Sequence, residues 1–279
     1  RYFWSLITLG SYDKLPVMVK YINPSFIKKF FPNFEKLEEK LPIIHEKLQS
    51  LQHSNALVYY GIVKERDTFG FVMSRPNLVF KEWLEERSSN TELSEKDKQF
   101  LIRSCIDICS VLSHSHENNW FLGQFGSNDI YLSYSFSKQS LEIQLDVYSS
   151  LGICNILASE YGCKIPKSEK KCRLNYAYCA PEVLQRRNFS PCADVWCFGV
   201  LVWELWNLGA PPYGNILDQR STESIQSFVE FICKPNSTKL TLKNLDNPNL
   251  EIILEKVFKV KPSDRPKIGE IMEILSKLR

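Results

Sequence analysis

The pattern of apolar residues changes near residue 74, and this change constrains the fold more than any single motif. Upstream, short β-branched and aromatic segments predict strands at 2–10, 15–22, 56–63 and 69–74. The first two flank the polar turn "SYDK", which is typical of a β-hairpin. One segment with apolar residues at helical spacing, 41–53, lies among these strands. The upstream part therefore predicts a small β-rich lobe with one helix.

Downstream of this point, helical periodicity dominates and is interrupted by a polar hairpin at 133–140. It predicts helices at 80–87, 94–116, 190–207, 222–233, 249–258 and 267–278. The sequence thus predicts one domain of the α+β class over 1–279. Its N-terminal lobe would span 1–73, a short connector 74–77, and a larger, mainly helical lobe 78–279.

Composition narrows the classes of partner. With 35 Lys and Arg against 32 Asp and Glu, the net charge is only +3, so we expect neither nucleic acid nor an anionic membrane as a partner. No apolar run reaches the roughly 18 residues that a membrane span requires. The longest candidate, Cys197–Trp206, is interpreted as a buried helix, and no leader is recognised. We therefore expect no membrane insertion.

The nine cysteines are scattered and odd in number, which favours a reducing compartment over a disulfide framework. The cytoplasm is the expected location. Cys105, Cys109, His114 and His116 have a spacing that a zinc site could use, but the two cysteines lie one turn apart in an apolar-periodic segment. Packing cysteines are the favoured interpretation, and no metal is expected.

Residues 178–215, "YCAPEVLQRRNFSPCADVWCFGVLVWELWNLGAPPYGN", contain A-P-E, then D-V-W-x-F-G-V and L-G-x-x-P-Y. This series resembles the C-terminal lobe of protein kinases, and its ending leans toward tyrosine kinases. Upstream, "VMVK" at 17–20 is similar to the strand that carries the family's phosphate-binding lysine, here Lys20, and "PSDRPKIGEIM" is similar to its closing helix. The resemblance covers nearly the whole chain and implies a bilobed, kinase-like fold.

The resemblance also implies roles for several structural residues. Glu182 and Arg265 would form the family's buried ion pair, and Asp194 would accept hydrogen bonds from the backbone of the catalytic loop. The family's stacked hydrophobic column would be Leu48, Tyr59, Leu122 and Leu151. All these roles concern stability and need no catalysis.

The catalytic positions look different. A kinase has H-R-D-L-x-x-x-N in its catalytic loop, and the match places Leu122-Gly123-Gln124 at H-R-D and Asp129 at the final Asn. A glutamine amide cannot accept a proton near neutral pH. D-F-G, which normally supplies a magnesium ligand, is matched to Ser150-Leu151-Gly152, and the glutamate that normally pairs with the lysine is matched to Ile44.

These matches lead to the hypothesis that the chain is not an enzyme but a pseudokinase without the catalytic Asp, the D-F-G Asp and the helix Glu. It would act as a regulatory, allosteric or scaffolding domain through protein contacts. The expected partner is a protein, for example a kinase domain in the same chain or in another. Similarity to the pseudokinase domains of Janus-type tyrosine kinases supports this hypothesis, which requires no cofactor.

Two alternatives remain open. The domain could sense nucleotide, binding ATP weakly and without magnesium at Lys20, with Met73 and Ser74 at the entrance to the connector. It could instead be a weak, unconventional kinase that uses Asp129 and Lys20.

The segment from Ser150 to Glu182, which matches the activation loop, adds one further choice. Three tyrosines in it, Tyr161, Tyr176 and Tyr178, are candidate regulatory phosphorylation sites. A solvated loop without a regulatory role is the plainer interpretation.

Overall fold

The computed structural model describes residues 4–31, 33–88, 93–137, 139–148, 152–153, 156–157, 175–186, 188–234, 240 and 248–278. Two compact units emerge from the contacts between residues. Unit 1 consists of Arg1–Asn77 and Asp146–Arg173, and unit 2 of Leu78–Leu145 and Leu174–Arg279. Each unit is described by itself.

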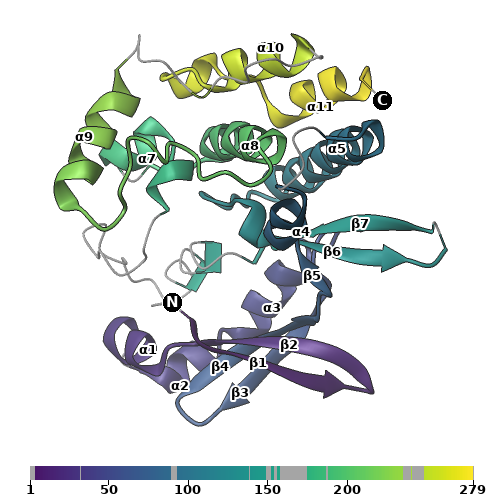
Figure 1. Cartoon of the computed structure of the whole chain (residues 1–279). Coiled ribbons are helices and arrows are strands. Elements are labelled where there is room, and N and C mark those ends of the chain that lie inside the picture. The colour runs from purple at the N-terminus through teal and green to yellow at the C-terminus, as the bar shows by residue number, and fades with distance from the viewer. Residues whose placement is uncertain are drawn as a thin grey trace. The chain divides into compact units, whose positions relative to one another are not determined.

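Unit 1 contains a four-stranded antiparallel sheet in the order β1-β2-β4-β3 (Figure 1). The strands are β1 (Trp4–Tyr12), β2 (Leu15–Ile22), β3 (Tyr59–Glu65) and β4 (Thr68–Ser74). Asp13 and Lys14 join β1 to β2 with φ of 46° and 65°. Left-handed conformations at both positions are typical of the two-residue turn that matches the twist of a hairpin.

The helix expected in this unit is α3 (Leu41–Gln49), which packs on β3. Two further helices, α1 (Pro24–Phe30) and α2 (Phe34–Glu38), were not expected. Each begins after an asparagine whose side chain accepts a backbone N–H: Asn23 from Ser25 at 2.9 Å, and Asn33 from Lys36 at 3.0 Å. Asparagine at the N-cap is a strong signal for the start of a helix. The prediction of a single helix in this unit was wrong because these two caps were overlooked.

Unit 2 is mainly helical. Its helices are α4 (Phe80–Arg87), α5 (Glu95–Glu117), α7 (Pro181–Arg186), α8 (Pro191–Trp206), α9 (Thr222–Cys233), α10 (Pro248–Val257) and α11 (Ile268–Ser276). Its strands β5 (Leu78–Val79), β6 (Ile130–Ser135) and β7 (Ser140–Leu145) form a small antiparallel sheet. Short 3-10 helices lie at η1 (Ser127–Asp129), η2 (Tyr176–Tyr178) and η3 (Pro262–Asp264).

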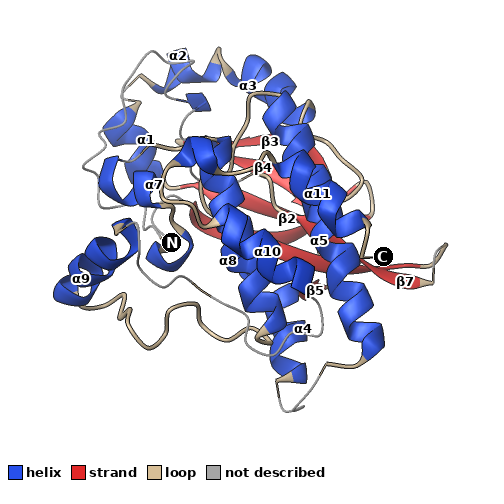
Figure 2. Ribbon diagram, turned by 90° about the horizontal axis from the view of Figure 1, so that it is seen from above, coloured by secondary structure: helices blue, strands red, loops and turns tan. Residues whose placement is uncertain are grey.

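The core of unit 2 surrounds α8, which is apolar on nearly all sides and buried along most of its length. Helix α5 contacts α8 and α11, and α10 contacts the same two helices (Figure 2). At Gly199 of α8, an added Cβ would lie 2.4 Å from Cγ2 of Val257 in α10. Glycine at this position therefore permits the close approach of the two helices.

The α+β class predicted from the sequence is confirmed, since an antiparallel sheet characterises one unit and helices the other. Within the described residues, no helix is both long enough and apolar enough to cross a bilayer. Cys105 and Cys109 are buried as free thiols in α5. Among all the residues that the structure describes, no group of three or more His, Cys, Asp or Glu side chains is placed to hold a metal ion.

Candidate functional site

Lys20 and Asp146 form a buried ion pair in unit 1. Lys20 lies in the C-terminal half of β2, opposite Phe71 of β4, and its Nζ contacts Oδ2 of Asp146. The two residues are only 4% and 6% exposed, and the other carboxylate oxygen accepts the backbone N–H of Tyr148 at 3.2 Å. A lysine and a carboxylate are thus held together away from water, where charges interact strongly.

The sequence prediction missed Asp146. It placed D-F-G at Ser150-Leu151-Gly152 and inferred that the acid of this motif was lost. Ser150 and Leu151 lie outside the described residues, but the acid that meets Lys20 is Asp146, four residues earlier and directly after β7. Asp146-Val147-Tyr148 has the acid of D-F-G but not its glycine, whereas Ser150-Leu151-Gly152 has the glycine but not the acid.

Ile44 of α3 is fully buried, and its assignment to the position of the helix glutamate stays a prediction. An apolar side chain offers no charge to Lys20, and Asp146 supplies a counter-charge. A lone buried ammonium would be costly, so one carboxylate within reach is required.

Met73 and Ser74 end strand β4. Met73 is fully buried, while Ser74 exchanges hydrogen bonds with Val58: its N–H donates to the carbonyl at 2.8 Å and its Oγ accepts the N–H at 3.1 Å. The serine thereby fixes the end of the sheet. A nucleotide contact at either residue stays a prediction.

Three of the four members of the expected hydrophobic column are described, and all three are buried, whereas Leu151 lies outside the described residues. Leu48 and Tyr59 are 0% and 2% exposed, and the Tyr59 ring lies 5.4 Å from that of Tyr148, centroid to centroid. The Tyr59 hydroxyl lies 2.9 Å from Nδ1 of His45, and burial raises the pKa of Tyr59 above its usual value. Leu122, in unit 2, is also fully buried.

In unit 2, Asp194 of α8 organises the loop that matches the catalytic loop. It is fully buried and accepts the backbone N–H groups of Leu122 at 2.9 Å and Gly123 at 2.6 Å. Nε2 of His116 lies 3.0 Å from the same carboxylate. Gly123 has a φ of 77°, a left-handed conformation that glycine adopts at little cost. Backbone and side-chain donors therefore fix the position of Gln124, the next residue.

Gln124 holds neighbouring backbone. Its Oε1 accepts the N–H of Asn175 at 2.9 Å, and the thiol of Cys179 lies 3.7 Å from the same oxygen. The amide thus connects the loop to the segment that leads into A-P-E. Because an amide has no basic lone pair on nitrogen, it offers hydrogen bonds but no proton acceptance.

Asp129 closes the same loop, accepting the N–H of Gly126 at 2.9 Å. Gly126 approaches the ring of Tyr178 so closely that an added Cβ would lie 2.6 Å from it. The sequence match places Asp129 where the family has an amide, and a carboxylate is the kind of oxygen ligand that divalent cations bind.

A buried network around Glu204 was not predicted. Glu204 of α8 is 1% exposed and accepts bonds from Tyr178 Oη at 2.6 Å, Ser127 Oγ at 2.7 Å and Lys81 Nζ at 3.2 Å. The signal was an isolated glutamate in the apolar helix "CFGVLVWELW". A buried carboxylate needs such donors, and here they connect α8 to the three segments that carry Tyr178, Ser127 and Lys81.

This network corrects one candidate regulatory site. Tyr178 is 5% exposed, and burial, together with the Glu204 carboxylate, raises its pKa well above the usual value. A kinase could not reach its hydroxyl without unfolding the network. Tyr176 in η2 is half-buried, and Tyr161 lies outside the described residues.

Glu182 and Arg265 form a two-pronged ion pair, with both N–O distances 2.7 Å. Arg265 also donates to the carbonyls of Cys192 and Lys259, each at 2.8 Å, and its guanidinium lies 5.1 Å from the ring centroid of Trp196. Every side of this buried cation has a partner, which is the condition for such a pair to be tolerated in a core.

The sheet with its buried lysine and the helical unit with its Asp194-anchored loop define the class of protein kinase-like domains. The family model for protein tyrosine and serine/threonine kinases matches residues 7–275. The chain therefore belongs to this family. The kinase-like fold expected from the motifs is confirmed.

Several curated proteins are similar to the chain. Tyrosine-protein kinase Fer of Rattus norvegicus is 23% identical over 96% of the chain, and tyrosine-protein kinase TXK of Mus musculus 21% over 99%. Inactive tyrosine-protein kinase kin-32 of Caenorhabditis elegans is 23% identical over 83%. The chain spans 29%, 46% and 24% of the length of these relatives, respectively.

The prediction that the chain is not an enzyme is contradicted. The matching family is one of kinases, and Fer, TXK and Activated Cdc42 kinase Ack of Drosophila melanogaster are all named as kinases. The structure adds a physical reason. One of the acids whose supposed loss supported that prediction, the partner of Lys20, is present as Asp146.

Proposed function

We propose that this kinase-family domain has a regulatory role in signalling, as an allosteric or scaffolding domain that binds another protein. A kinase domain in the same chain or in another is the first candidate for that partner. The observation that supports this proposal is the use of Gln124. In a loop that Asp194 fixes, its amide holds Asn175 and Cys179, so the loop is built as a structural connection.

This role resembles that of pseudokinase domains, including those of Janus-type kinases, and the likeness to inactive tyrosine-protein kinase kin-32 supports it. The proposal concerns what the domain does to its partner. It holds whether or not the domain also transfers phosphate, because one domain can do both. We place this role in the cytoplasm, and the free thiols of Cys105, Cys109 and Cys197 support a reducing compartment.

The test is a titration of the domain into a panel of tyrosine kinase domains, with the rate of peptide phosphorylation as the readout. We expect a saturable change of rate for at least one of them, and a weaker effect with Gln124→Ala, which releases the 175–179 segment. As a matched control, Gln49→Ala changes a glutamine at the exposed C-terminal end of α3. Rates that stay constant across the panel would count against regulation.

Phosphotransfer is the second candidate function. The family match favours it, and so do two carboxylates: Asp146 beside Lys20, and Asp129 in the catalytic-type loop. The assay is transfer of labelled γ-phosphate by the unmodified chain. Lys20→Met should abolish any transfer, whereas Lys28→Met, at an exposed position of α1, should not. A signal that survives Lys20→Met would point to a contaminating kinase.

For ATP, unit 1 offers the Lys20 ammonium to phosphate and the Asp146 carboxylate to magnesium, so its residues fit the phosphate end of the ligand. Asp146 already holds Lys20, so phosphate must compete with this carboxylate for the lysine. A divalent cation that binds the carboxylate relieves that competition. We therefore expect ATP to stabilise the chain more with magnesium than without it, which differs from the metal-free binding predicted from the sequence.

Thermal unfolding with ATP, with and without magnesium, tests this expectation. Lys20→Met should remove the ATP-induced rise of Tm, and Lys28→Met should keep it. If millimolar ATP leaves Tm unchanged in both buffers, nucleotide binding at Lys20 is wrong, and the regulatory proposal remains to be judged by the kinase panel.

A further inference from the structure

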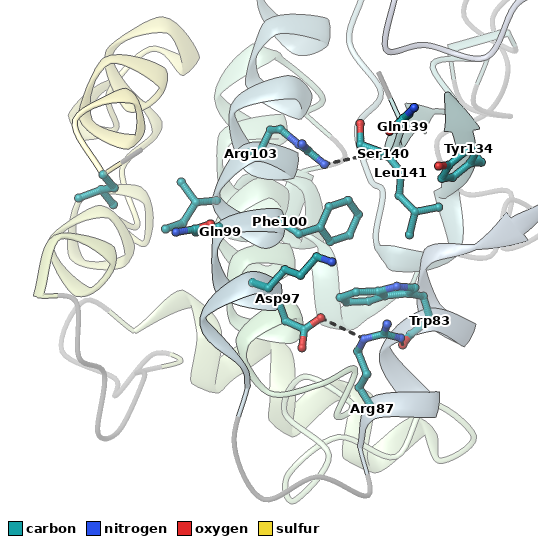
Figure 3. Close-up of a pocket in the computed structure, with 13 residues that line it drawn as sticks. Trp83, Arg87, Asp97, Gln99, Phe100, Arg103, Tyr134, Gln139, Ser140 and Leu141 are labelled. Carbon is teal, nitrogen blue, oxygen red and sulfur yellow. Dashed lines mark hydrogen bonds and ion pairs between the residues drawn. The ribbon is translucent and has the colours of Figure 1, made fainter. Parts of the chain in front are cut away.

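A cavity of about 730 Å³ opens on unit 2 between α4, the first turns of α5 and the β6–β7 hairpin. We call it the α4–α5 groove. Trp83 of α4, Phe100 of α5, and Tyr134 and Leu141 of the hairpin supply its apolar walls (Figure 3). None of the residues discussed above as candidate catalytic or nucleotide-binding groups lines it. The groove is therefore a separate feature of the kinase-family fold in this chain.

The charges that line the groove are mostly positive. Arg87, Lys96 and Arg103 contribute three cations, and Asp97 one carboxylate. Asp97 accepts a bond from Arg87 at 3.2 Å, while Lys96 is exposed and has no ion-pair partner within the described part of the chain. The excess of cations is the complement of a ligand that carries several negative charges.

The two arginines are held in place by aromatic rings. The Arg87 guanidinium lies 3.7 Å from the ring centroid of Trp83, and that of Arg103 lies 5.5 Å from Phe100. Arg103 also donates to the carbonyl of Leu141 at 2.9 Å, as Figure 3 shows. Each guanidinium has more N–H donors than these contacts use. A planar guanidinium held in one orientation can bind both oxygens of a carboxylate.

The hairpin that borders the groove carries an exposed aromatic pair. Tyr134 is 47% and Phe136 86% exposed, and their ring centroids are 5.3 Å apart. Figure 1 shows the β6–β7 hairpin extending away from the helices of its unit. Rings exposed beside a recess are typical of surfaces that another protein covers.

We propose that the α4–α5 groove docks an acidic segment of a protein partner. Carboxylates of the segment bind Lys96, Arg103 and Arg87, and an apolar side chain packs against Trp83, Phe100 and the Tyr134–Phe136 pair. The proposal rests on the proposed function only in that both require a protein partner. Charge complementarity and apolar walls together favour a peptide over a small anion, which would leave the aromatic surfaces uncovered.

The probe is a fluorescein-labelled peptide of about ten residues, rich in Glu and Asp with Leu and Phe interspersed, whose extended length of roughly 33 Å can follow the groove. Binding to the whole chain is measured by fluorescence anisotropy. A peptide of the same length in which Gln replaces every acid is the control ligand. We expect only the acidic peptide to bind, with an affinity that falls as salt is added.

Three variants locate the site. Lys96→Glu should weaken binding about tenfold or more, since reversing one charge changes the contact from attraction to repulsion. Phe136→Ala should weaken it severalfold and disturb no core, because the side chain is 86% exposed. Lys256→Glu, the same change at an exposed lysine of α10 outside the groove, is the matched control and should leave affinity unchanged.

Equal loss with Lys96→Glu and Lys256→Glu would overturn the proposal, because attraction would then come from net charge alone. Displacement of the peptide by inorganic phosphate at equal charge concentration would assign the groove to small anions and overturn it as well. Failure of peptide binding leaves the kinase-panel result untouched, so the groove and the regulatory role are judged separately.

Discussion

Asp194 in unit 2 and Asp146 in unit 1 are both buried carboxylates, yet their surroundings differ in kind. Asp194 accepts backbone N–H groups of Leu122 and Gly123 and lies beside His116. Asp146 is held by Lys20, at the end of a long side chain, and by one backbone N–H, that of Tyr148. Rigid donors dominate the first site and a movable cation the second.

The difference separates an acid that maintains the fold from one that can change partners. Backbone donors cannot leave Asp194 without moving the loop, so their loss is a loss of structure. A lysine side chain has several rotatable bonds, and it can turn to a phosphate if another cation takes its place. We therefore expect mutations of Asp194 to be expressed as stability and those of the Lys20–Asp146 pair as stability and ligand response together.

The largest effect is expected from Asp194→Asn. The amide NH₂ would face a backbone N–H that has lost its acceptor, and an unsatisfied buried group costs roughly 1 to 3 kcal/mol. With two backbone donors and His116 affected, the free energy of unfolding should fall by about 4 kcal/mol. Urea unfolding monitored by tryptophan fluorescence measures it.

Asp264→Asn is the matched control. The Asp264 side chain is 55% exposed, and its ion pair with Lys261, at 3.8 Å, lies on the surface. Its unfolding free energy should change by less than about 0.5 kcal/mol. Similar losses for the two variants would show that the backbone donors contribute little.

Glu182→Gln is expected to rank next. It leaves the Arg265 guanidinium buried without a counter-charge, which typically costs about 3 kcal/mol or more, although the carbonyls of Cys192 and Lys259 still accept from it. The same urea assay applies. Glu273→Gln, at an exposed site of α11, is the control and should leave the free energy of unfolding unchanged. If Glu182→Gln destabilised the chain less than Lys20→Met does, the expected ranking would be wrong.

Lys20→Met tests the movable pair. The change removes the ammonium donor of Asp146 and leaves the N–H of Tyr148, so we expect a loss of about 2 kcal/mol, as for an unsatisfied buried polar group. Adding Asp146→Asn to Lys20→Met should cost less than the sum of the two single changes, with a coupling of about 1 to 2 kcal/mol, because each change removes the same interaction. Strict additivity in urea unfolding would mean that the two side chains do not interact.

The smallest effect on stability is expected from a change of Asp97. This residue is a third kind of carboxylate, which lines the partly exposed α4–α5 groove. The hydrogen bond from Ser94, aided by Arg87, lowers its pKa below the ordinary value of 3.8. Its stabilising contribution is therefore present above that value and is lost as pH falls through the lower pKa of the folded state. Asp97→Asn should reduce stability slightly at pH 7 and not at the acidic end, as thermal unfolding across pH would record.

Much of the fold could be predicted from local patterns. The turn residues Asp13 and Lys14 and the capped start of α5 at Ser94 lie where polar residues interrupt apolar periodicity. Helices α1 and α2 were missed because both are short and bordered by prolines, where apolar spacing is hard to recognise. In the sequence, α1 begins at Pro24 and precedes Pro32, and α2 lies between Pro32 and Pro42. Their asparagine caps were the readable signal.

The candidate site was harder to predict, because its partners are distant in sequence. Lys20 and Asp146 are separated by 126 positions, so no periodicity connects them. The sequence match placed Ser150 at the acid of D-F-G, and only the structure shows that Asp146 follows β7 directly and contacts Lys20. The burial of Tyr178 was equally unreadable, since it depends on Glu204 in another helix.

The hydrogen bonds of the Arg265 guanidinium also affect the order in which unit 2 folds. Its acceptors are Glu182, Cys192 and two consecutive carbonyls, those of Lys259 and Val260, and the carboxylate lies 83 positions from the arginine. The entropy of closing so large a loop must be overcome before any of these bonds to the distant segment forms. In a nascent chain the Glu182 carboxylate therefore cannot meet Arg265 until residue 265 has emerged from the ribosome, 83 positions later.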